Sequence, residues 1–483
     1  MRSDGNSVSA TESDQNALLA KGGGTLVVTG ASVDKSGDDN NGDNCNFYGL
    51  NSIALSLGNG SLLKISNSKL GATSEGSNGV FSTDSATAYV RDSSITTSAG
   101  NSRGLDATYG GTILADTLDI STQGDHSAGV ATDRGGGNIS LTNSTIKTAG
   151  SGSPLLYSTG DIELNNVTGS SSGSQIAGME GLNTILINNS TLESTQSGKT
   201  ASDPIADGII IYQSTSGDAE TATGKTAIFQ AVGSTLKSAI TSGSMFYFTN
   251  TKADVVLKDT ALDFDSTAAN LILAAGNSSN NWGSAGSNGA AVSFTGISQT
   301  LSGNVEADTI SSVKLSLTSS TTWTGAATIR DNESATDSTK TEAPITVNVD
   351  ASSTWVVNGG STVTNLAVAD GGKVVDTSGA DVTIKDASGT VLREGSSNVT
   401  LTVTGSYSTS YDADGAGSLS SDLIDRNAFD NEYDTSTAFT LGADAQTSAS
   451  SSAHVGASAS TENSGQNWWD AIVSWFKGLF GLS

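Results

Sequence analysis

The chain is poor in the residues that would point to a disulfide scaffold or to nucleic-acid binding. Cys45 is the only cysteine among 483 residues, so no disulfide can form within the chain. Proline occurs 3 times, and aromatic residues make up 5% of the chain. Lysine and arginine total 22 against 49 acidic residues, which gives a formal net charge of −27. This charge argues against nucleic acid and anionic lipid as partners, since both require a basic surface.

Long apolar runs and helical patterns are also missing. No run of 18 apolar residues is present, so the sequence predicts no transmembrane helix. No apolar core of about 7 to 15 residues follows Met1, so the first residues do not read as a secretion signal. Apolar stripes at helical spacing are absent before residue 468, which excludes a helical solenoid. The 57 glycines, with many Ser, Thr, Asn and Asp residues, instead favour short strands joined by tight turns.

A strand-and-turn motif recurs through the first half of the chain. An aliphatic strand leads into Asn or Asp, then Ser or Thr, and closes on an aliphatic anchor, as in Asn143, Ser144 and Ile146. A repeat period near 25 residues is typical of a solenoid, in which each unit buries its apolar side chains against its neighbours. Counting the degenerate copies, the anchors are Val33, Leu70, Ile95, Ile120, Ile146, Val167, Leu192, Leu236 and Leu262.

The phase of the repeat indicates what each unit buries. Apolar residues stand seven and five positions before most anchors, as Ile139 and Leu141 do before Ile146, and this alternation places them on one face of a strand. Asn, Asp or Gly stands three positions before the anchor in most copies, which predicts a bend there. A second apolar tract recurs every 25 residues at Val80, Leu105, Val130 and Leu155. We therefore predict an all-β parallel β-helix with coils of about 25 residues.

The organisation along the chain follows from these patterns. Insertions lengthen the spacing at 37–60 and 196–224, and residues 276–290 form a long loop. Such loops are the usual place for a solenoid to carry specificity. The expected parts are an N-terminal polar cap at 1–20, a regular array at 21–275, a continued β-helix with Trp-containing repeats at 276–405, a C-terminal cap region at 406–442, a flexible linker at 443–466 and an amphipathic helix at 467–483.

Two later repeats carry a family resemblance. Trp323 and Trp355 close similar strands 32 residues apart, and the second is followed by the stretch Val356–Gly372. With Gly124–Val130, these repeats resemble the passengers of pertactin-like and AIDA-type autotransporter adhesins, over about 20–405. The resemblance implies a right-handed β-helix and a bacterial surface protein. The chain lacks the alternating ten-residue strands of the membrane domain that follows such passengers, so self-translocation is not expected.

The resemblance and the composition together predict a non-enzymatic, adhesin-like solenoid. We expect it to be extracellular or at the cell surface and to present binding loops to a protein or glycan ligand. No cofactor or metal is expected, because the oxygen-rich stretch 37–44 does not place its residues in the order of a calcium loop. Thr25, Thr96, Thr97, Thr112 and Thr122 do not repeat at one position, which argues against an ice-binding face.

An enzyme of the pectate-lyase-like β-helix type is the alternative. Such lyases need clustered carboxylates for calcium and an Arg or Lys base, while the related hydrolases use paired Asp residues with a nearby His. The matching residues lie near equivalent positions of adjacent coils, although one His among Ser and Gly is usually a turn residue. The candidates for catalysis are Asp106, Asp125, His126, Asp133 and Arg134.

The C-terminal segment is the strongest local signal in the sequence. It holds three of the six tryptophans, and its apolar side chains gather on one face of a predicted helix. A helix of this length is too short to span a bilayer and suits a membrane interface, a partner groove or the end of the solenoid. The residues expected to make this contact are Trp468, Trp469, Ile472, Val473, Trp475, Phe476, Leu479 and Phe480.

Overall fold

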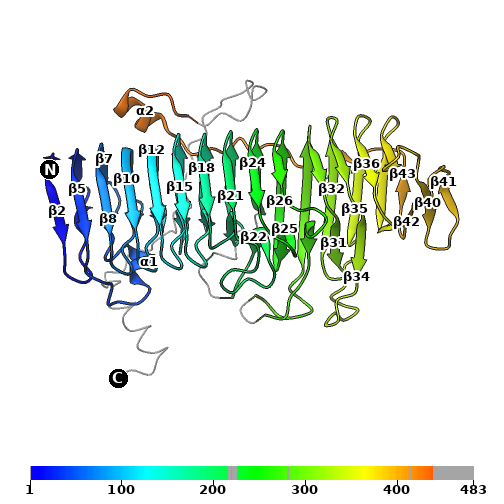
Figure 1. The fold of residues 1–483 in the computed structure, drawn as a ribbon, viewed down its shortest axis with the longest axis horizontal. Helices are drawn as coiled ribbons and strands as arrows, with labels where there is room; N and C mark the ends of the chain where they lie inside the picture. The colour runs from blue at the N-terminus through cyan, green and yellow to red at the C-terminus, as the bar shows by residue number, and fades with distance from the viewer. Residues whose placement is uncertain (1, 216–218, 220–225, 280–281, 414–415, 439–483) are drawn as a thin grey trace, which may run out of the picture. The chain divides into compact units, whose positions relative to one another are not determined.

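The chain folds into a parallel β-helix. The computed structural model describes residues 2–215, 219, 226–279, 282–413 and 416–438, all within a compact unit that spans 1–449. Parallel strands stack coil upon coil along one axis (Figure 1). The predicted fold class is confirmed for these residues. The expected linker at 443–466 and the expected helix at 467–483 lie outside the described residues.

Each coil contributes strands to three faces, numbered in chain order. Face 1 is a 12-stranded sheet of β3 (Leu18–Lys21), β6 (Ala54–Leu57), β9 (Val80–Thr83), β11 (Leu105–Ala107), β13 (Val130–Thr132), β16 (Leu156–Ser158), β19 (Ala177–Glu180), β22 (Asp207–Tyr212), β25 (Ser244–Thr249), β28 (Asn270–Ala274), β31 (Val305–Asp308) and β34 (Ala327–Arg330). Face 2 holds β1 (Arg2–Asp4), β4 (Thr25–Thr29), β7 (Leu62–Ser66), the first parts of β10 (Thr87–Thr97) and β12 (Gly111–Thr122), β14 (Gly137–Thr142), β17 (Asp161–Asn165), β20 (Thr184–Asn188), β23 (Ala227–Val232), β26 (Thr251–Lys258), β29 (Ala290–Ile297), β32 (Ser312–Thr318), β35 (Ile345–Val349), β38 (Asn365–Val368) and β43 (Tyr407–Ser408).

Face 3 follows face 2 after a bend. It holds β2 (Ser7–Ala10), β5 (Ser32–Lys35), β8 (Lys69–Ala72), the second parts of β10 and β12, β15 (Thr145–Thr148), β18 (Thr168–Ser171), β21 (Thr191–Ser194), β24 (Thr235–Ser238), β27 (Ala261–Asp263), β30 (Thr300–Ser302), β33 (Thr322–Thr324), β36 (Thr354–Val357) and β39 (Lys373–Asp376).

The ends of the stack are irregular. β1 and β2, within the segment expected as an N-terminal cap, pair with β4 and β5 as a first partial coil. At the other end stand β37 (Ser361–Val363), β40 (Thr383–Asp386), β41 (Val391–Arg393) and β42 (Thr400–Val403), with β40 and β41 antiparallel.

Most anchor side chains point into the interior of the coil, as predicted. Ile146 is 1% exposed and pairs in register with Ile120 of the preceding coil, whereas its neighbour Lys147 is exposed. The next coil corrects the prediction, because Ile146 pairs with Gly169 and not with Val167. Val167 lies two residues earlier, at the position that Ser144 and Ser190 occupy in the flanking coils. An aliphatic side chain at a serine position produced the error.

A similar offset occurs on face 1. Val80, Leu105 and Val130 are in register as expected, but Val130 pairs with Leu156 rather than with Leu155. Both leucines are fully buried. The sequence pattern could not choose between two adjacent apolar residues, because the turn from β13 to β14, at 133–136, is one residue longer than the turn at 108–110 and shifts the register by one.

The bend between faces 2 and 3 forms where the sequence predicted it. Asn67, Asp92, Asn143 and Asn189 adopt left-handed backbone angles, with φ between 46° and 50°. Asn and Asp tolerate this conformation better than other residues with a side chain. Each bend turns the chain into a new strand direction within one coil.

The serine that follows the bend residue repairs the backbone pairing that the bend interrupts. Ser93 Oγ accepts the Ser68 N–H at 3.0 Å, and Ser190 Oγ accepts the Val167 N–H at 3.0 Å. The Ser190 hydroxyl also donates to the Asn188 carbonyl at 2.7 Å. A buried N–H without a partner destabilises the fold, so this serine explains the second residue of the repeat motif.

The two repeat tryptophans lie in the interior. The Trp323 and Trp355 rings stack with centroids 4.6 Å apart, and both are fully buried. Their indole N–H groups donate to the carbonyls of Gly303 and Gly325 at 2.8 and 2.9 Å. A Cβ on Gly325 would stand 2.1 Å from the Gly303 oxygen, so the backbone can pass here only without a side chain.

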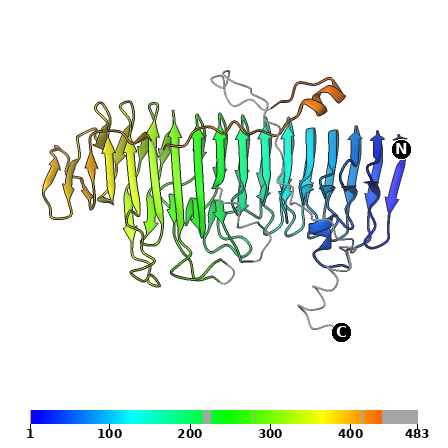
Figure 2. The ribbon, with the colours of Figure 1, turned by 180° about the vertical axis from the view of Figure 1, so that it is seen from behind.

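After β43 the chain reverses and runs back along the outer side of face 2. The described part of this strap, residues 409–413 and 416–438, crosses successive coils toward the N-terminal half and carries α2 (Asn427–Tyr433) near its end (Figures 1 and 2). The Gly417 N–H donates to Thr295 Oγ1 at 2.7 Å, and the Ile424 N–H donates to Glu163 Oε1 at 2.6 Å. The segment expected as a C-terminal cap at 406–442 therefore differs from expectation: its described part covers a side of the solenoid.

Apolar and charged contacts hold the strap in place. Phe429 is fully buried against Tyr89 and Leu114 of face 2. The Arg426 guanidinium is buried as well and donates to the carbonyls of Ser140 and Ala115 at 2.6 and 3.1 Å. Burial lowers the pKa of Arg426 to about 10, which still leaves it charged at neutral pH.

Candidate functional site

The longer turns of the solenoid flank face 1. Turns 36–53 and 195–206 enter this face from face 3. Turns 331–344 and 275–289, the latter described at 275–279 and 282–289, leave it toward face 2. Figure 1 shows them on the side of the stack away from the strap, which follows the outer side of face 2. The expected insertions at 37–60 and 196–224 therefore overlap turns at this face, although each also includes a strand, β6 and β22 respectively.

The first of these turns carries α1 (Asn44–Tyr48), which covers part of the enzyme candidate set. Beneath α1, Arg103 donates to Asp106 Oδ2 at 3.2 Å and to Asp133 Oδ2 at 2.9 Å. It also donates to the Asn46 side-chain oxygen at 2.6 Å. Face 1 therefore brings Asp106 and Asp133 together, as the sequence suggested, but with an arginine between them that the sequence reasoning did not select.

Burial dominates the electrostatics of this cluster. Asp106 is fully buried, and desolvation raises its pKa well above the usual value despite the neighbouring Arg103 charge. The two carboxylates in turn raise the pKa of Arg103. Cys45 of α1 is buried beside the cluster, and burial raises the pKa of its thiol to about 12, which leaves it protonated and unreactive. The cluster is an internal ion-pair network that a polymeric substrate does not reach in this conformation.

Arg134 borders this network, since its backbone N–H donates to Asp133 Oδ1 at 2.8 Å, whereas Asp125 and His126 lie on another turn. Arg134 is half-buried, and its guanidinium lies 3.8 Å from the centre of the Phe47 ring of α1. Asp125 and His126 are exposed on the turn between faces 3 and 1, where Asp125 Oδ1 accepts the Ser151 N–H at 2.8 Å. The sequence placed these candidates on one surface. In the structure, Asp125 and His126 lie on the turn before β13, and Asp133 and Arg134 lie on the turn after it.

A second set of polar side chains on face 1 was not predicted. The Tyr157 hydroxyl donates to Glu180 Oε2 at 2.9 Å, and Ser214 also donates to the Glu180 carboxylate. The Tyr212 ring lies 4.2 Å from the ring of Trp282, which comes from turn 275–289. Glu180 and Trp282 are 2% and 5% exposed, so these groups bond and pack with one another and are closed to a ligand in this conformation. The irregular lengths of the intervening turns hid this grouping from the sequence pattern.

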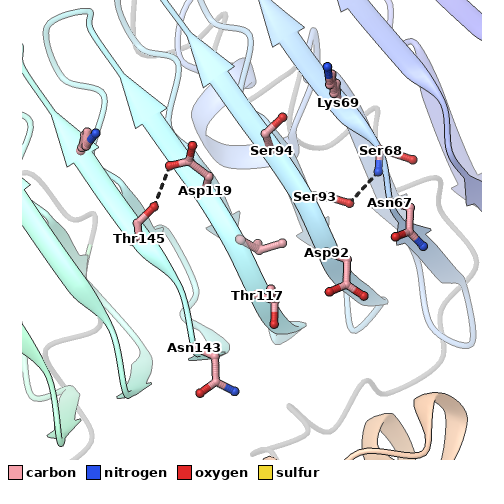
Figure 3. A pocket seen from close by; sticks show the side chains of 12 residues that line it. Asn67, Ser68, Lys69, Asp92, Ser93, Ser94, Thr117, Asp119, Asn143 and Thr145 are labelled. Atoms are coloured by element: carbon pink, nitrogen blue, oxygen red, sulfur yellow. Dashed lines mark hydrogen bonds between the residues drawn. The ribbon is translucent and has the colours of Figure 1, made fainter.

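Face 3 carries a shallow groove beside the bend (Figure 3). Its volume is about 870 Å³, and its lining combines hydroxyls and amides with charges of both signs, Lys69, Lys147, Asp92 and Asp119. The Thr145 hydroxyl donates to Asp119 Oδ1 at 2.6 Å across neighbouring coils. Mixed donors and acceptors favour a neutral, polar ligand over a strongly charged one.

Threonines form an outward column that continues from this groove. Thr145, Thr168, Thr191 and Thr235 are in register on successive coils. Ala261 ends this run, so the column is limited to part of the face. The threonines named from the sequence lie at other positions. A usable signal was present, because three of these threonines directly precede the anchors Ile146, Leu192 and Leu236.

The described ranges hold neither a metal-ligand cluster nor a membrane-spanning helix. No group of three or more His, Cys, Asp or Glu side chains within the described ranges is arranged to hold a metal. Neither helix of those ranges, α1 or α2, has the length and apolar character to cross a bilayer. The C-terminal candidates lie outside the described residues: Trp468, Trp469, Ile472, Val473, Trp475, Phe476, Leu479 and Phe480.

Comparison with known proteins adds no assignment. No protein-family model, curated protein or solved structure matches this chain.

Proposed function

We propose that this protein is an adhesin-like β-solenoid, extracellular or at a bacterial cell surface, that binds a protein or glycan ligand through the turns around face 1. The observation that carries the proposal is the position of the long turns: all four described above flank the same face, while the strap follows another. A solenoid scaffold holds such turns in fixed relative positions, which suits multi-point recognition.

Shortening the turns tests this function. Turn 331–344 joins β34 to β35 and can be replaced by a short link of the kind found at 309–311, because its middle residues are exposed. We expect this variant to keep the thermal unfolding of the full chain and to lose binding to bacterial or host cells. Shortening an equally exposed turn away from face 1 serves as the control. Unchanged cell binding in the variant with the shortened turn 331–344 would contradict the proposal.

The alternative, a polysaccharide lyase or hydrolase, requires Asp106 and Asp133 to become accessible. The burial of this pair beneath α1 and its pairing with Arg103 favour the adhesin function. Incubation with polygalacturonate, with and without calcium, separates the two functions. Unsaturated products or new reducing ends, abolished by Asp133→Ala or Arg134→Ala, would support the enzyme instead.

The C-terminal segment is proposed to contact a membrane interface through its apolar face. Its sequence places Trp469 and Trp475 among apolar residues, which gives a direct readout. We expect a blue shift of Trp fluorescence when zwitterionic vesicles are added to the full chain, and none after deletion of 466–483. If the deletion lowers the melting temperature of the β-helix, and vesicles cause no blue shift in the full chain, the segment caps the solenoid instead.

A further inference from the structure

The groove on face 3 runs along the stacking axis and crosses four coils (Figure 3). Bend residues form one side, and the outward residues two positions later form the other, so both sides repeat once per coil. These columns are Asn67, Asp92, Thr117 and Asn143, and Lys69, Ser94, Asp119 and Thr145. Because neighbouring strands lie about 4.8 Å apart, the groove is roughly 15 Å long. It therefore offers similar contacts at each of four coils.

The lining of the groove is polar along its whole length. The floor between the two columns consists of buried residues, Ser68, Ser93 and Leu118. The sides carry hydrogen-bonding groups that the fold does not use, because the side chains of Asn67 and Lys69 have no hydrogen bond or ion pair within the described ranges. A groove of this kind fits a ligand that is itself polar along its length.

Two carboxylates of the lining are held in fixed positions. Arg91 Nε donates to Asp92 Oδ2 at 2.7 Å, and Arg91 Nη1 donates to the Tyr433 carbonyl of the strap at 3.2 Å. The Thr145 hydroxyl donates to Asp119 Oδ1 at 2.6 Å, which leaves Oδ2 as an acceptor. Groups fixed in this way lose little side-chain freedom when they bind a ligand. The lining is therefore preorganised, and the strap contributes to it.

Charge and strand pairing exclude other linear polymers. Lys69 and Lys147 balance Asp92 and Asp119, so the lining favours neither a polyanion nor a polycation. A peptide cannot add as a strand, because β10 and β12 are already paired on both edges. An extended peptide also advances about 3.3 Å per residue, which does not match the height of a coil.

We propose that the groove on face 3 binds a neutral, linear glycan, with successive sugar units beside successive coils. A pyranose unit of an extended glycan is about as long as one coil is high. Its hydroxyls both donate and accept hydrogen bonds, which matches the amide, hydroxyl, ammonium and carboxylate groups of the lining. The groove belongs to face 3, so this site does not depend on what the turns around face 1 bind.

Calorimetric titration of the full chain with oligosaccharides tests the site. The neutral probes are cellotetraose, laminaritetraose and maltotetraose with their disaccharides, and tetragalacturonate is the acidic comparison. We expect at least one neutral tetrasaccharide to bind. It should bind more tightly than its disaccharide, because four sugar units reach all four coils, and more tightly than tetragalacturonate.

Variants of the lining locate the binding. Asp119→Ala removes a charged acceptor and should weaken the binding of this tetrasaccharide at least about tenfold. Asp263→Ala is the matched control, since Asp263 is an exposed aspartate on face 3 outside the groove. Asn67→Gly removes an amide, tolerates the positive φ of the bend and should also weaken binding. Thermal unfolding checks that each variant is folded.

Several results would overturn the proposal. These are no binding of any neutral tetrasaccharide, equal affinity for the tetrasaccharide and its disaccharide, tighter binding of tetragalacturonate, and equal affinities of Asp119→Ala and Asp263→Ala. The variant with the shortened turn 331–344 should bind the tetrasaccharide as wild type does. This result separates the groove from the cell binding proposed for the turns around face 1.

Discussion

Single residues in this fold act according to their position within the coil. Ile146 is buried between Ile120 and Gly169, while Lys147 beside it faces solvent. We predict that Ile146→Asp lowers the free energy of unfolding by about 3 kcal/mol or more, because it buries an unpaired charge. Lys147→Asp should change it by less than about 0.5 kcal/mol. Thermal unfolding followed by circular dichroism measures both changes. Equal, small effects of the two substitutions would show that Ile146 does not point into the interior.

The serines after the bend give a second prediction at this scale. Ser190→Ala leaves the Val167 N–H without its acceptor and should cost about 1 to 3 kcal/mol. Ser170→Ala, in the same region of face 3 but partly exposed, is the matched control and should cost less than about 0.5 kcal/mol. Denaturant unfolding of the two variants distinguishes them. A silent Ser190→Ala would show that water or a backbone shift satisfies this N–H.

Among the elements, the strap is the one whose attachment responds to pH. Glu163 accepts the Ile424 N–H of the strap, and burial raises the pKa of Glu163 to about 8 from its usual 4.5. The folded state thus holds a proton that the unfolded state releases, so stability is full below pH 4.5 and falls as the pH rises toward about 8. The loss from this one group amounts to up to about 5 kcal/mol.

Glu163→Gln keeps the acceptor for the Ile424 N–H and removes the titration. We expect its melting temperature to exceed that of wild type at pH 8, and the difference to shrink as the pH approaches 4.5. Melting curves at several pH values measure this difference. Asp337→Asn, a change at an exposed position of turn 331–344, controls for the loss of one negative charge. Parallel pH profiles for wild type and Glu163→Gln would contradict the prediction.

For the whole molecule, the stacking of coils stabilises the fold and the repulsion between its negative charges destabilises it. One coil cannot offset the ordering cost of some 25 residues with its few buried side chains, so coils are stable only together. The net charge of −27 opposes this stacking, and salt screens it. We therefore predict that adding sodium chloride at neutral pH raises the melting temperature of the full chain. A flat or falling melting temperature would show that local ion pairs outweigh the net repulsion.

The sequence by itself determined the β-helix, the period of the coils, the inward anchors and the bends, because these features rest on local rules. Side-chain alternation and the backbone preference of Asn and Asp repeat in every coil and can be counted along the chain. There are two exceptions. Leu155 and Leu156 satisfy the same rule side by side, and Val167 is an aliphatic residue at a serine position, so only pairing with neighbouring coils decides these registers.

Only the tertiary structure decided the sites. Arg103 lies between Asp106 and Asp133 because α1 covers face 1, and Arg426 reaches carbonyls about 300 residues away because the strap runs back along face 2. Contacts of this kind depend on turn lengths and on the path of a returning segment, which no local pattern encodes.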